Sequence, residues 1–228
     1  MRKRSVSLIY KIARELKNLL VGFVELGLVY TQRIILAIKE HPIEKALGIE
    51  TSESYHKKSD TSLYKDLCDY IPSPYGKIKE ILTYVRLGPD DVFVDLGCGK
   101  GRVVFFVAQE RIKKVIGVEV DRNLVEIARE NYRNLKLSRT PVEIVEADAA
   151  TYISNEGTVF FMYDPFGYKT VEAIVGNIKK SLEMRARRIR IVYYSPGYRH
   201  ILDDEDWLEL EQEINTGEIL IWHDSSFK

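Results

Sequence analysis

The sequence predicts an α/β protein with a doubly wound, mostly parallel seven-stranded sheet, an antiparallel C-terminal hairpin and an N-terminal helical extension. From residue 91 onward, short apolar runs alternate with amphipathic stretches, which is typical of parallel strands joined by helical crossovers. Three glycines fall within five positions directly after the first apolar run. The last two strand-like runs are joined by Asn-Thr-Gly, which predicts a hairpin and ends the alternation.

The first fifty residues carry one apolar stripe. Its members recur every three or four residues from Leu8 to Ile38, which predicts a long amphipathic helix. The His-Pro pair at 41–42 is expected to end it, because the residue before a proline avoids helical dihedral angles. Three partners stay open for residues 1–40: the rest of the chain or a second copy, the surface of an anionic membrane, and the membrane interior. A span is disfavoured, since a charge at the bilayer centre costs about 2.5–3.5 kcal/mol, and any extension meets Glu25 or Arg33.

The chain divides into an extension with linker over residues 1–62 and a larger domain over 63–228. Residues 50–62 are polar and lack periodicity, so we expect a linker or a mobile loop there. Residues 1–58 hold eleven Lys and Arg against six Asp and Glu, a net of +5, and the remainder of this neutral chain balances it with −5. An acidic body of this kind disfavours general binding of nucleic acid.

The elements after the linker follow from periodicity and end signals. Ser73 and Pro74 are expected to be the N-cap and first residue of a helix that runs through Arg86 and stops at Gly88-Pro89. Parallel strands are expected at 92–96, 114–120, 142–148, 158–164 and 188–195. Helices are expected at 101–110, at 121–135 with Asp121 as N-cap, and at 169–182. The hairpin takes residues 207–224.

Composition limits the chemistry. The only two cysteines, Cys68 and Cys98, argue against a disulfide framework and suit a reducing compartment. The four histidines are scattered and show no zinc-ligand spacing, so no structural metal is expected. The arginine-rich run at 185–190 precedes the fifth strand, where a solvated turn is the favoured interpretation over a nucleic-acid contact.

The glycine-rich segment should form a ligand-binding loop, because ligands of doubly wound sheets bind beyond the carboxyl ends of the strands. A P-loop is excluded, since Gly99-Lys100 is followed by Gly101 and not by Ser or Thr. The dinucleotide fingerprint would require Gly or Ala where Arg102 stands. The remaining pattern is D-x-G-x-G-x-G, which starts at Asp95 and continues through Gly97, Gly99 and Gly101.

At this point the sequence resembles the class I S-adenosylmethionine-dependent methyltransferases. "VDLGCGKG", "VIGVEVD" and "VEADA" stand at family-like spacing, and the resemblance extends from the helix near residue 74 to the end of the chain. It implies an enzyme that uses S-adenosylmethionine. It also implies that Glu119 accepts from the ribose hydroxyls, that Asp148 accepts from the adenine amine, and that Asp95 orders the loop or meets the cofactor ammonium through water. The expected cofactor-binding set is completed by Gly97, Cys98 as a small packing residue, Gly99, Gly101, Val120, Ala149 and Tyr75.

The segment after the fourth strand is the candidate methyl-acceptor site. "FFMYDPFGYK", residues 160–169, is similar to the [D/N]-P-P-[Y/F] motif of methyltransferases that act on nitrogen, with one proline in place of two. The candidate catalytic residues are Asp164 and the Pro165 carbonyl as hydrogen-bond acceptors and Phe166 as an aromatic wall. A tight turn is the competing interpretation, since Asp-Pro-x-Gly is good turn material. Five tyrosines either surround the acceptor or pack the core: Tyr70, Tyr75, Tyr193, Tyr194 and Tyr198.

A second resemblance concerns the acceptor. "YIPSPYGKIKEIL", "GVEVDRNLV" and "TGEILIWHD" are similar to segments of prokaryotic and mitochondrial lysine methyltransferases that modify ATP-synthase subunits, although "YDPFG" differs from the fourth-strand loop of that family. We therefore expect methyl transfer to a nitrogen on a protein side chain. The alternatives are methylation of a small molecule or a nucleic-acid base, and a non-catalytic docking module that only holds the cofactor. A protein or small-molecule acceptor is favoured over long nucleic acid, and a cytoplasmic location is expected, either free or attached to the cytoplasmic face of a membrane.

Overall fold

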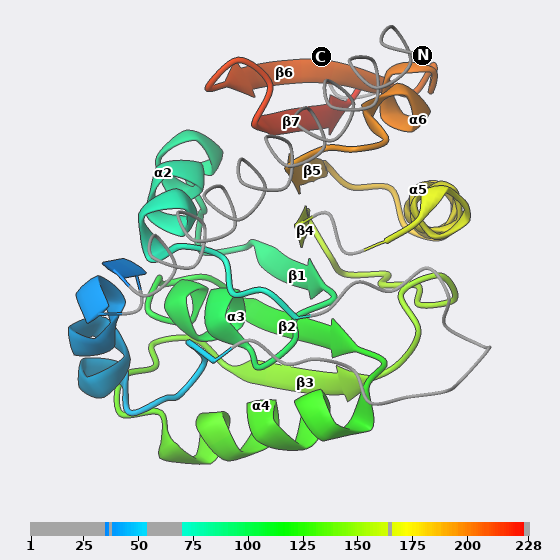
Figure 1. Cartoon of the computed structure of the whole chain (residues 1–228). Helices are drawn as coiled ribbons and strands as arrows, with labels where there is room; N and C mark the ends of the chain where they lie inside the picture. The colour runs from blue at the N-terminus through cyan, green and yellow to red at the C-terminus, as the bar shows by residue number, and fades with distance from the viewer. Residues whose placement is uncertain (1–34, 37, 54–69, 164–165, 226–228) are drawn as a thin grey trace, which may run out of the picture. The chain divides into compact units, whose positions relative to one another are not determined.

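The computed structural model describes residues 35–36, 38–53, 70–163 and 166–225 (Figure 1). The chain falls into two compact units, Met1–Pro42 and Ile43–Lys228, and the sheet belongs to the second. Most of the predicted stripe from Leu8 to Ile38 lies outside the described residues. Among the residues that are described, no helix has the length and apolar character needed to cross a membrane.

The prediction that the His-Pro pair ends the first helix is wrong. Residues 38–47 are helical, and the helix ends at Gly48, whose N–H donates to the Glu44 carbonyl at 2.7 Å. Gly48 has a φ of 79°, the left-handed conformation that commonly closes a helix. Leu47 and Ile49 are buried in the core of the second unit, so tertiary packing outweighs the local preference before proline.

Within the predicted linker or mobile loop, the described residues form neither helix nor strand. Residues 50–53 are described, and within them Thr51 is fully buried and hydrogen-bonded. Residues 43–53 belong to the same compact unit as the sheet, whereas the sequence assigned them to the N-terminal extension. A short polar stretch looks like a loop in sequence even when each polar group has a buried partner.

The sheet has seven strands in the order β3-β2-β1-β4-β5-β7-β6, which confirms the predicted fold class. The first five strands are parallel neighbours, and β7 pairs antiparallel with both β5 and β6. The chain order reverses between β1 and β4, so the crevice between their carboxyl ends is the expected ligand position. The strands are β1 (Val92–Leu96), β2 (Lys114–Glu119), β3 (Val142–Glu146), β4 (Val159–Tyr163), β5 (Arg190–Tyr194), β6 (Leu208–Ile214) and β7 (Ile219–Asp224).

The helices mostly follow the prediction. Asp121 caps α4 as expected, since its side chain accepts from the backbone N–H groups of Asn123 and Leu124. Ser73 does not cap α2, which begins after Pro74 and ends at Val85. The shortest helix, α6, was not predicted. The helices of the second unit from residue 70 onward are α2 (Tyr75–Val85), α3 (Arg102–Val107), α4 (Arg122–Asn134), α5 (Tyr168–Met184) and α6 (Arg199–Asp203).

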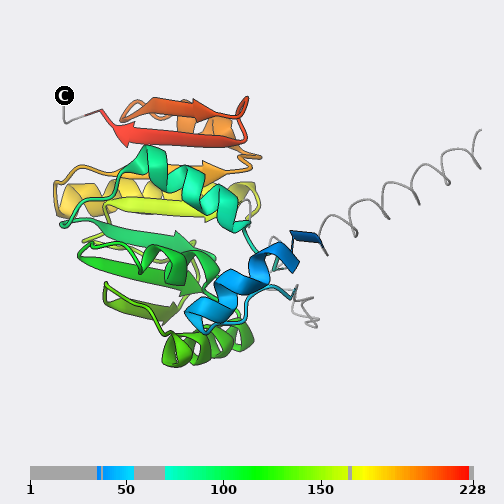
Figure 2. The same ribbon diagram turned by 90° about the vertical axis from the view of Figure 1, so that its left-hand side faces the viewer.

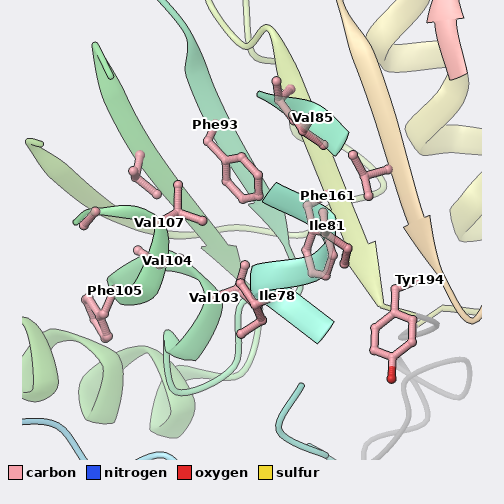
Figure 3. Close-up of a cluster of buried hydrophobic side chains, with 14 of the residues drawn as sticks. Ile78, Ile81, Val85, Phe93, Val103, Val104, Phe105, Val107, Phe161 and Tyr194 are labelled. Carbon is pink, nitrogen blue, oxygen red and sulfur yellow. The ribbon is translucent and has the colours of Figure 1, made fainter. Parts of the chain in front are cut away.

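Two apolar clusters cover the two faces of the sheet. One contains the inner sides of α2 and α3 and reaches Phe93 of β1 and Phe161 of β4 (Figure 3). The other contains α5 and α6 and reaches Val94 and Met162 from the same two strands. The view turned by 90° shows α2 and α3 in front of the sheet and α5 behind it (Figure 2). Continuous apolar runs in β1 and β4 follow from this, because each strand is buried on both faces.

Candidate active site

The carboxyl ends of β1, β2, β3 and β4 bring the predicted site segments to one edge of the sheet. Residues 97–101 follow β1, residues 120–121 follow β2 and residues 147–149 follow β3. After β4, the structure describes the chain again from Phe166 onward. These segments are far apart in the sequence, and the parallel pairing of the strands brings them together.

The glycine-rich loop is held by its own backbone. Gly97, Gly99 and Gly101 all have positive φ values, 79°, 53° and 86°. The N–H groups of Gly97 and Cys98 both donate to the Val118 carbonyl, at 2.8 and 3.0 Å, which ties the loop to β2. A Cβ on Gly99 would lie 2.3 Å from the Tyr70 ring, so a side chain there is excluded by contact as well as by φ.

The carboxylate of Glu119 hydrogen-bonds to the backbone of this loop and of the residues after β2. Its Oε2 accepts from Gly99 N at 2.9 Å, and its Oε1 accepts from the N–H groups of Val120 and Asp121 at 2.8 and 2.9 Å. Burial raises the pKa of Glu119, and the hydrogen bonds from Asp121, Gly99 and Val120 oppose that rise. A carboxylate has about four acceptor positions, so Glu119 keeps capacity for the ribose hydroxyl that the resemblance assigns to it.

Asp95 lies in β1 and is 3% exposed. Its Oδ2 is buried and has no hydrogen-bond partner within the part of the chain that the structure describes. Burial, and after it the negative charge of Glu119, raise the pKa of Asp95 well above its usual range. We refer to Asp95 and Glu119 together as the acidic pair.

The acidic pair provides a test of whether the cofactor fits. A buried carboxylate oxygen without a donor costs free energy unless a ligand supplies one. Across the described ranges, no ion pair joins a cation to Asp95 or Glu119. S-adenosylmethionine carries an ammonium and a sulfonium, so its charge is of the sign that this pair requires.

The smaller members of the predicted cofactor set are packing or backbone positions. Cys98 is buried, and its Sγ lies 2.8 Å from the point where a Cβ on Gly117 would stand, so its side chain points against β2. Burial raises the pKa of the Cys98 thiol, which suits an inert packing role. Ala149 is buried in the cluster on the α5 face, and Val120 acts here through its N–H.

Asp148 lies two positions beyond the end of β3, at the predicted edge. Its Oδ1 accepts from Ala150 N at 2.8 Å, and its carbonyl accepts from the N–H groups of Thr151 and Tyr152. The side chain is half-buried and Oδ2 remains available to a ligand amine. The role of Asp148 toward adenine stays a prediction.

A group of buried polar residues beside the loop was missed by the sequence analysis. Arg102 is 2% exposed and pairs with Glu44 at 3.2 Å, and it also binds Thr51 and Ser52. We call these four residues the Arg102 cluster. The bulky Arg102 side chain, which excluded the dinucleotide fingerprint in the sequence, thus points toward residues 44–52. Such a contact joins positions far apart in sequence, and no local pattern signals it.

Tyr70 and Tyr75 complete this side of the loop. The Tyr70 hydroxyl donates to the Thr51 carbonyl at 3.0 Å, and its ring lies against Gly99. Tyr75 is buried, with its ring 4.6 Å from the Arg102 guanidinium carbon. Tyr75 therefore contacts Arg102, and its predicted role toward the cofactor stays a prediction.

The candidate acceptor side is only partly described. Asp164 and Pro165 lie outside the described residues, and the prediction that they align the acceptor stays a prediction. Phe166 is 6% exposed and packs in the cluster on the α5 face, so its ring is a core group in this structure and not a free wall.

An aromatic pair marks the edge next to that segment. Tyr163 ends β4 and Tyr194 ends β5, and their rings stack with centroids 4.3 Å apart. Burial, and then the neighbouring Tyr163, raise the pKa of Tyr194, whose hydroxyl points away from the other labelled side chains (Figure 3). Of the other predicted tyrosines, Tyr193 is fully buried, and Tyr198 meets Tyr168 edge-on at 6.1 Å.

A hollow of about 460 Å³ lies at the opposite edge of the sheet. Its lining includes Asp91, Thr158 and Ile189, which stand directly before β1, β4 and β5. It also includes Arg188 and Arg190 from the arginine-rich run, which places that run away from the predicted site. Arg187 of the same run is half-buried and donates to the carbonyls of Ser154, Gly157 and Ser181.

Comparison with known proteins relates this geometry to a family. The family model of the histone methylation protein DOT1 matches residues 70–141. A protein-lysine N-methyltransferase of Saccharolobus islandicus is 33% identical over 63 residues, which cover 27% of this chain and 39% of that relative. A histone-lysine N-methyltransferase, H3 lysine-79 specific, of Dictyostelium discoideum is 30% identical over 173 residues, which cover 66% of this chain and 9% of that relative.

Among solved structures, an RNA methyltransferase from Salinibacter ruber in complex with S-adenosyl-L-homocysteine is similar with a TM-score of 0.47 and 19% identity. That similarity covers 67% of this chain and 92% of the other. The chain spans less than half the length of the two curated relatives described above. The family match and the two relatives confirm the predicted resemblance to methyltransferases.

Proposed function

We propose that the protein is an S-adenosylmethionine-dependent methyltransferase and that it methylates a nitrogen on a protein side chain, with lysine as the favoured acceptor. The observation that supports methyltransferase activity is the buried acidic pair, Asp95 and Glu119, beside a loop of three glycines in the left-handed conformation. Lysine is favoured because two relatives are named as lysine methyltransferases.

The proposed cofactor role follows from the groups at the carboxyl edge. When bound, S-adenosylmethionine supplies a methyl on a positively charged sulfur, which a neutral nitrogen attacks as the S–C bond breaks and the N–C bond forms. Asp95 would face the ammonium and Glu119 the ribose, while Asp148 would accept from the adenine amine. The glycines admit the ligand because no Cβ stands between it and the backbone.

The acceptor side needs an amine that has lost its proton. A lysine ammonium has an ordinary pKa of about 10.4, so it must release a proton to water before attack. Tyr163 and Tyr194 stack on one another at the ends of β4 and β5, and aromatic rings at this edge suit contact with a lysine side chain. Asp164 is proposed to orient the amine, which places the reacting nitrogen in line with the methyl.

Two alternative functions give different experimental results. A small molecule or nucleic-acid base as acceptor would use the same cofactor site and show activity without any methylated protein. A docking module would bind the cofactor and show no turnover. Incubation of isotopically labelled S-adenosylmethionine with the protein and with extract from cells lacking it, followed by mass spectrometry of proteins and metabolites, separates the three. The proposal expects label on lysine; label on no molecule at all would contradict it.

Asp164→Ala tests the acceptor role. Loss of an aligning acceptor is expected to slow single-turnover transfer by roughly a hundred- to ten-thousand-fold, while affinity for S-adenosylhomocysteine stays unchanged. Asp206→Ala is the matched control, because Asp206 is 93% exposed. Near-normal transfer by the Asp164 variant would mean that the loop is only a turn.

Residues 1–40 are proposed to make a peripheral membrane contact or to self-associate, because the sequence places an apolar stripe there. Flotation with anionic vesicles and light scattering, each on the full chain and on a chain without residues 1–34, tests the two possibilities. A full chain that neither floats nor self-associates contradicts both.

A further inference from the structure

The Arg102 cluster joins the glycine-rich loop to a segment that is distant in sequence. Arg102 directly follows Gly101, the last glycine of the loop, and begins α3. Its Nε donates to Thr51 Oγ1 at 2.8 Å, and its Nη2 donates to Ser52 Oγ at 3.0 Å and to Glu44 Oε1 at 3.2 Å. Its Nη1 donates to the Ser73 carbonyl at 3.3 Å. One guanidinium thus holds three separate segments.

Glu44 is satisfied as completely as its partner. Its Oε1 accepts from Thr51 N at 2.8 Å and from Thr51 Oγ1, and its Oε2 accepts from Ser52 Oγ at 2.6 Å. Glu44 is 5% exposed and Thr51 is fully buried. A buried ion pair stabilises a fold little compared with apolar residues of the same volume, so stability alone is a weak reason for this arrangement.

A second buried side chain makes the same connection. Asn131 of α4 donates through Nδ2 to the carbonyls of Glu50 and Lys100, each at 3.1 Å, and its Oδ1 accepts from Glu50 N at 2.9 Å. Lys100 lies inside the glycine-rich loop. Asn131 therefore binds Glu50 on one side and the loop on the other, and Arg102, which directly follows the loop, binds residues 44–52.

The segment also positions Tyr70 at the loop. Thr51 supplies the carbonyl that accepts the Tyr70 hydroxyl, and the Tyr70 ring is the nearest group to the position of a Cβ on Gly99. Displacement of Thr51 would move this ring and change the space in front of Gly99. The N–H of Gly99 is bound to Glu119, so the same displacement reaches the acidic pair.

We propose that Glu44, Thr51 and Arg102 are positioning residues for the cofactor, which preset the glycine-rich loop and the Tyr70 ring before S-adenosylmethionine binds. The proposal rests on the methyltransferase function proposed above. These residues act through the loop and do not contact the ligand. They therefore raise the affinity for the cofactor through their hydrogen-bond geometry, and this effect can be measured separately from the stability of the fold.

The test measures the dissociation constant of S-adenosylhomocysteine by calorimetry on the full chain, with thermal unfolding recorded on the same samples. Thr51→Val keeps the shape of the side chain and removes its hydroxyl, and Thr51→Ser restores the hydroxyl. The double variant Glu44→Met/Arg102→Met replaces the ion pair by apolar groups, which is compatible with folding. Arg187→Met is the control, because it removes a half-buried arginine that binds carbonyls away from the loop.

Thr51→Val and the double variant are expected to bind about tenfold or more weakly, and Thr51→Ser is expected to stay within about twofold of the parent. Arg187→Met should lower the unfolding temperature and leave the dissociation constant unchanged. Folded Thr51→Val and double variants with parental affinity would overturn the proposal, as would a loss of affinity in Arg187→Met. If the double variant does not fold, the comparison of Thr51→Val with Thr51→Ser decides whether the proposal holds. A parent that binds no S-adenosylhomocysteine overturns the proposed function, and this inference with it.

Discussion

The two groups of buried charge beside the glycine-rich loop differ in how they are satisfied. In the Arg102 cluster, both charges are present and every carboxylate oxygen of Glu44 accepts a hydrogen bond. In the acidic pair, two carboxyl groups share one buried region, and Asp95 Oδ2 lacks a partner among the described residues. The first group is complete within the chain, whereas the second leaves one buried carboxyl oxygen to which no described group donates.

The difference shows how a fold reserves a position for a ligand. An unpaired buried charge costs several kcal/mol, so chains normally pair or expose it. Asp95 stays buried next to Glu119, and the burial raises its pKa. A ligand that supplies a cation recovers this cost on binding. The Arg102 cluster offers no such gain, and its role is to hold the segments that shape the site.

Truncation gives the largest test of this comparison. Removal of residues 1–50 deletes Glu44 and the core residue Leu47, so binding of S-adenosylhomocysteine should be lost. Removal of residues 1–34 should leave binding intact, because the unit that holds the sheet begins at Ile43. Calorimetry and near-ultraviolet circular dichroism on both forms provide the measurement. Equal binding by the two truncated chains would show that residues 43–50 do not support the site.

The single variant Arg102→Met is expected to have the next largest effect. It leaves the Glu44 carboxylate buried without its cation, which is expected to lower the free energy of unfolding by about 3–5 kcal/mol. The double variant with Glu44→Met should recover most of this loss. Urea denaturation of the parent and both variants tests it. A double variant as unstable as the single one would mean that packing volume, and not charge, dominates here.

Glu119→Ala sharpens the contrast from the acidic side. The variant is expected to weaken binding of S-adenosylhomocysteine by about 1.5–3 kcal/mol, the range for hydrogen bonds to charged groups. It also leaves the N–H groups of Gly99, Val120 and Asp121 without their acceptor, so the unfolding free energy should fall as well. Glu119→Gln keeps one acceptor oxygen and should lie between parent and Ala. Unchanged affinity in a folded Ala variant would mean that other groups hold the ribose.

Asp95→Asn is expected to give the smallest effect, with opposite signs in two measurements. Binding should weaken by about 0.5–1.5 kcal/mol, the range for one hydrogen bond. The stability of the ligand-free protein at neutral pH should rise, because Asn removes a charge that burial penalises. Calorimetry and urea denaturation measure the two quantities. A fall in both would indicate that Asp95 is already satisfied without ligand.

The raised pKa of Asp95 also predicts a pH dependence. The folded protein without ligand holds the proton more tightly than the unfolded chain, so its stability falls as pH rises from the unfolded pKa through the folded one. A cationic ligand favours the carboxylate, so binding should release protons and weaken as pH decreases from about 7 to about 4, where the ligand amine stays protonated. Asp95→Asn should remove this part of the dependence, and titration in buffers of different ionisation enthalpy measures the proton release.

The strands, most helices and the hairpin were predictable because local periodicity encodes them. Mostly apolar runs such as 92–96 indicate a strand buried on both faces, and Asp121 supplies a local N-cap signal that the structure confirms. The first helix was predicted to end too early, because the rule for the residue before proline is local and the burial of Leu47 is not. The five-residue helix α6 is too short to show a helical period.

The acids at the strand ends were found from the sequence because each lies at or just beyond the end of a recognisable strand, and parallel pairing determines that strand ends meet. Amino-acid order by itself thus determined the sheet, its switch point and the loop of glycines. Only the tertiary structure decided that Arg102 pairs with Glu44, that Tyr70 faces Gly99, and that Phe166 packs inward. The physical reason is range: backbone conformation and burial period act over a few residues, whereas the partner of a buried charge or ring is chosen by packing between segments that the chain brings together only on folding.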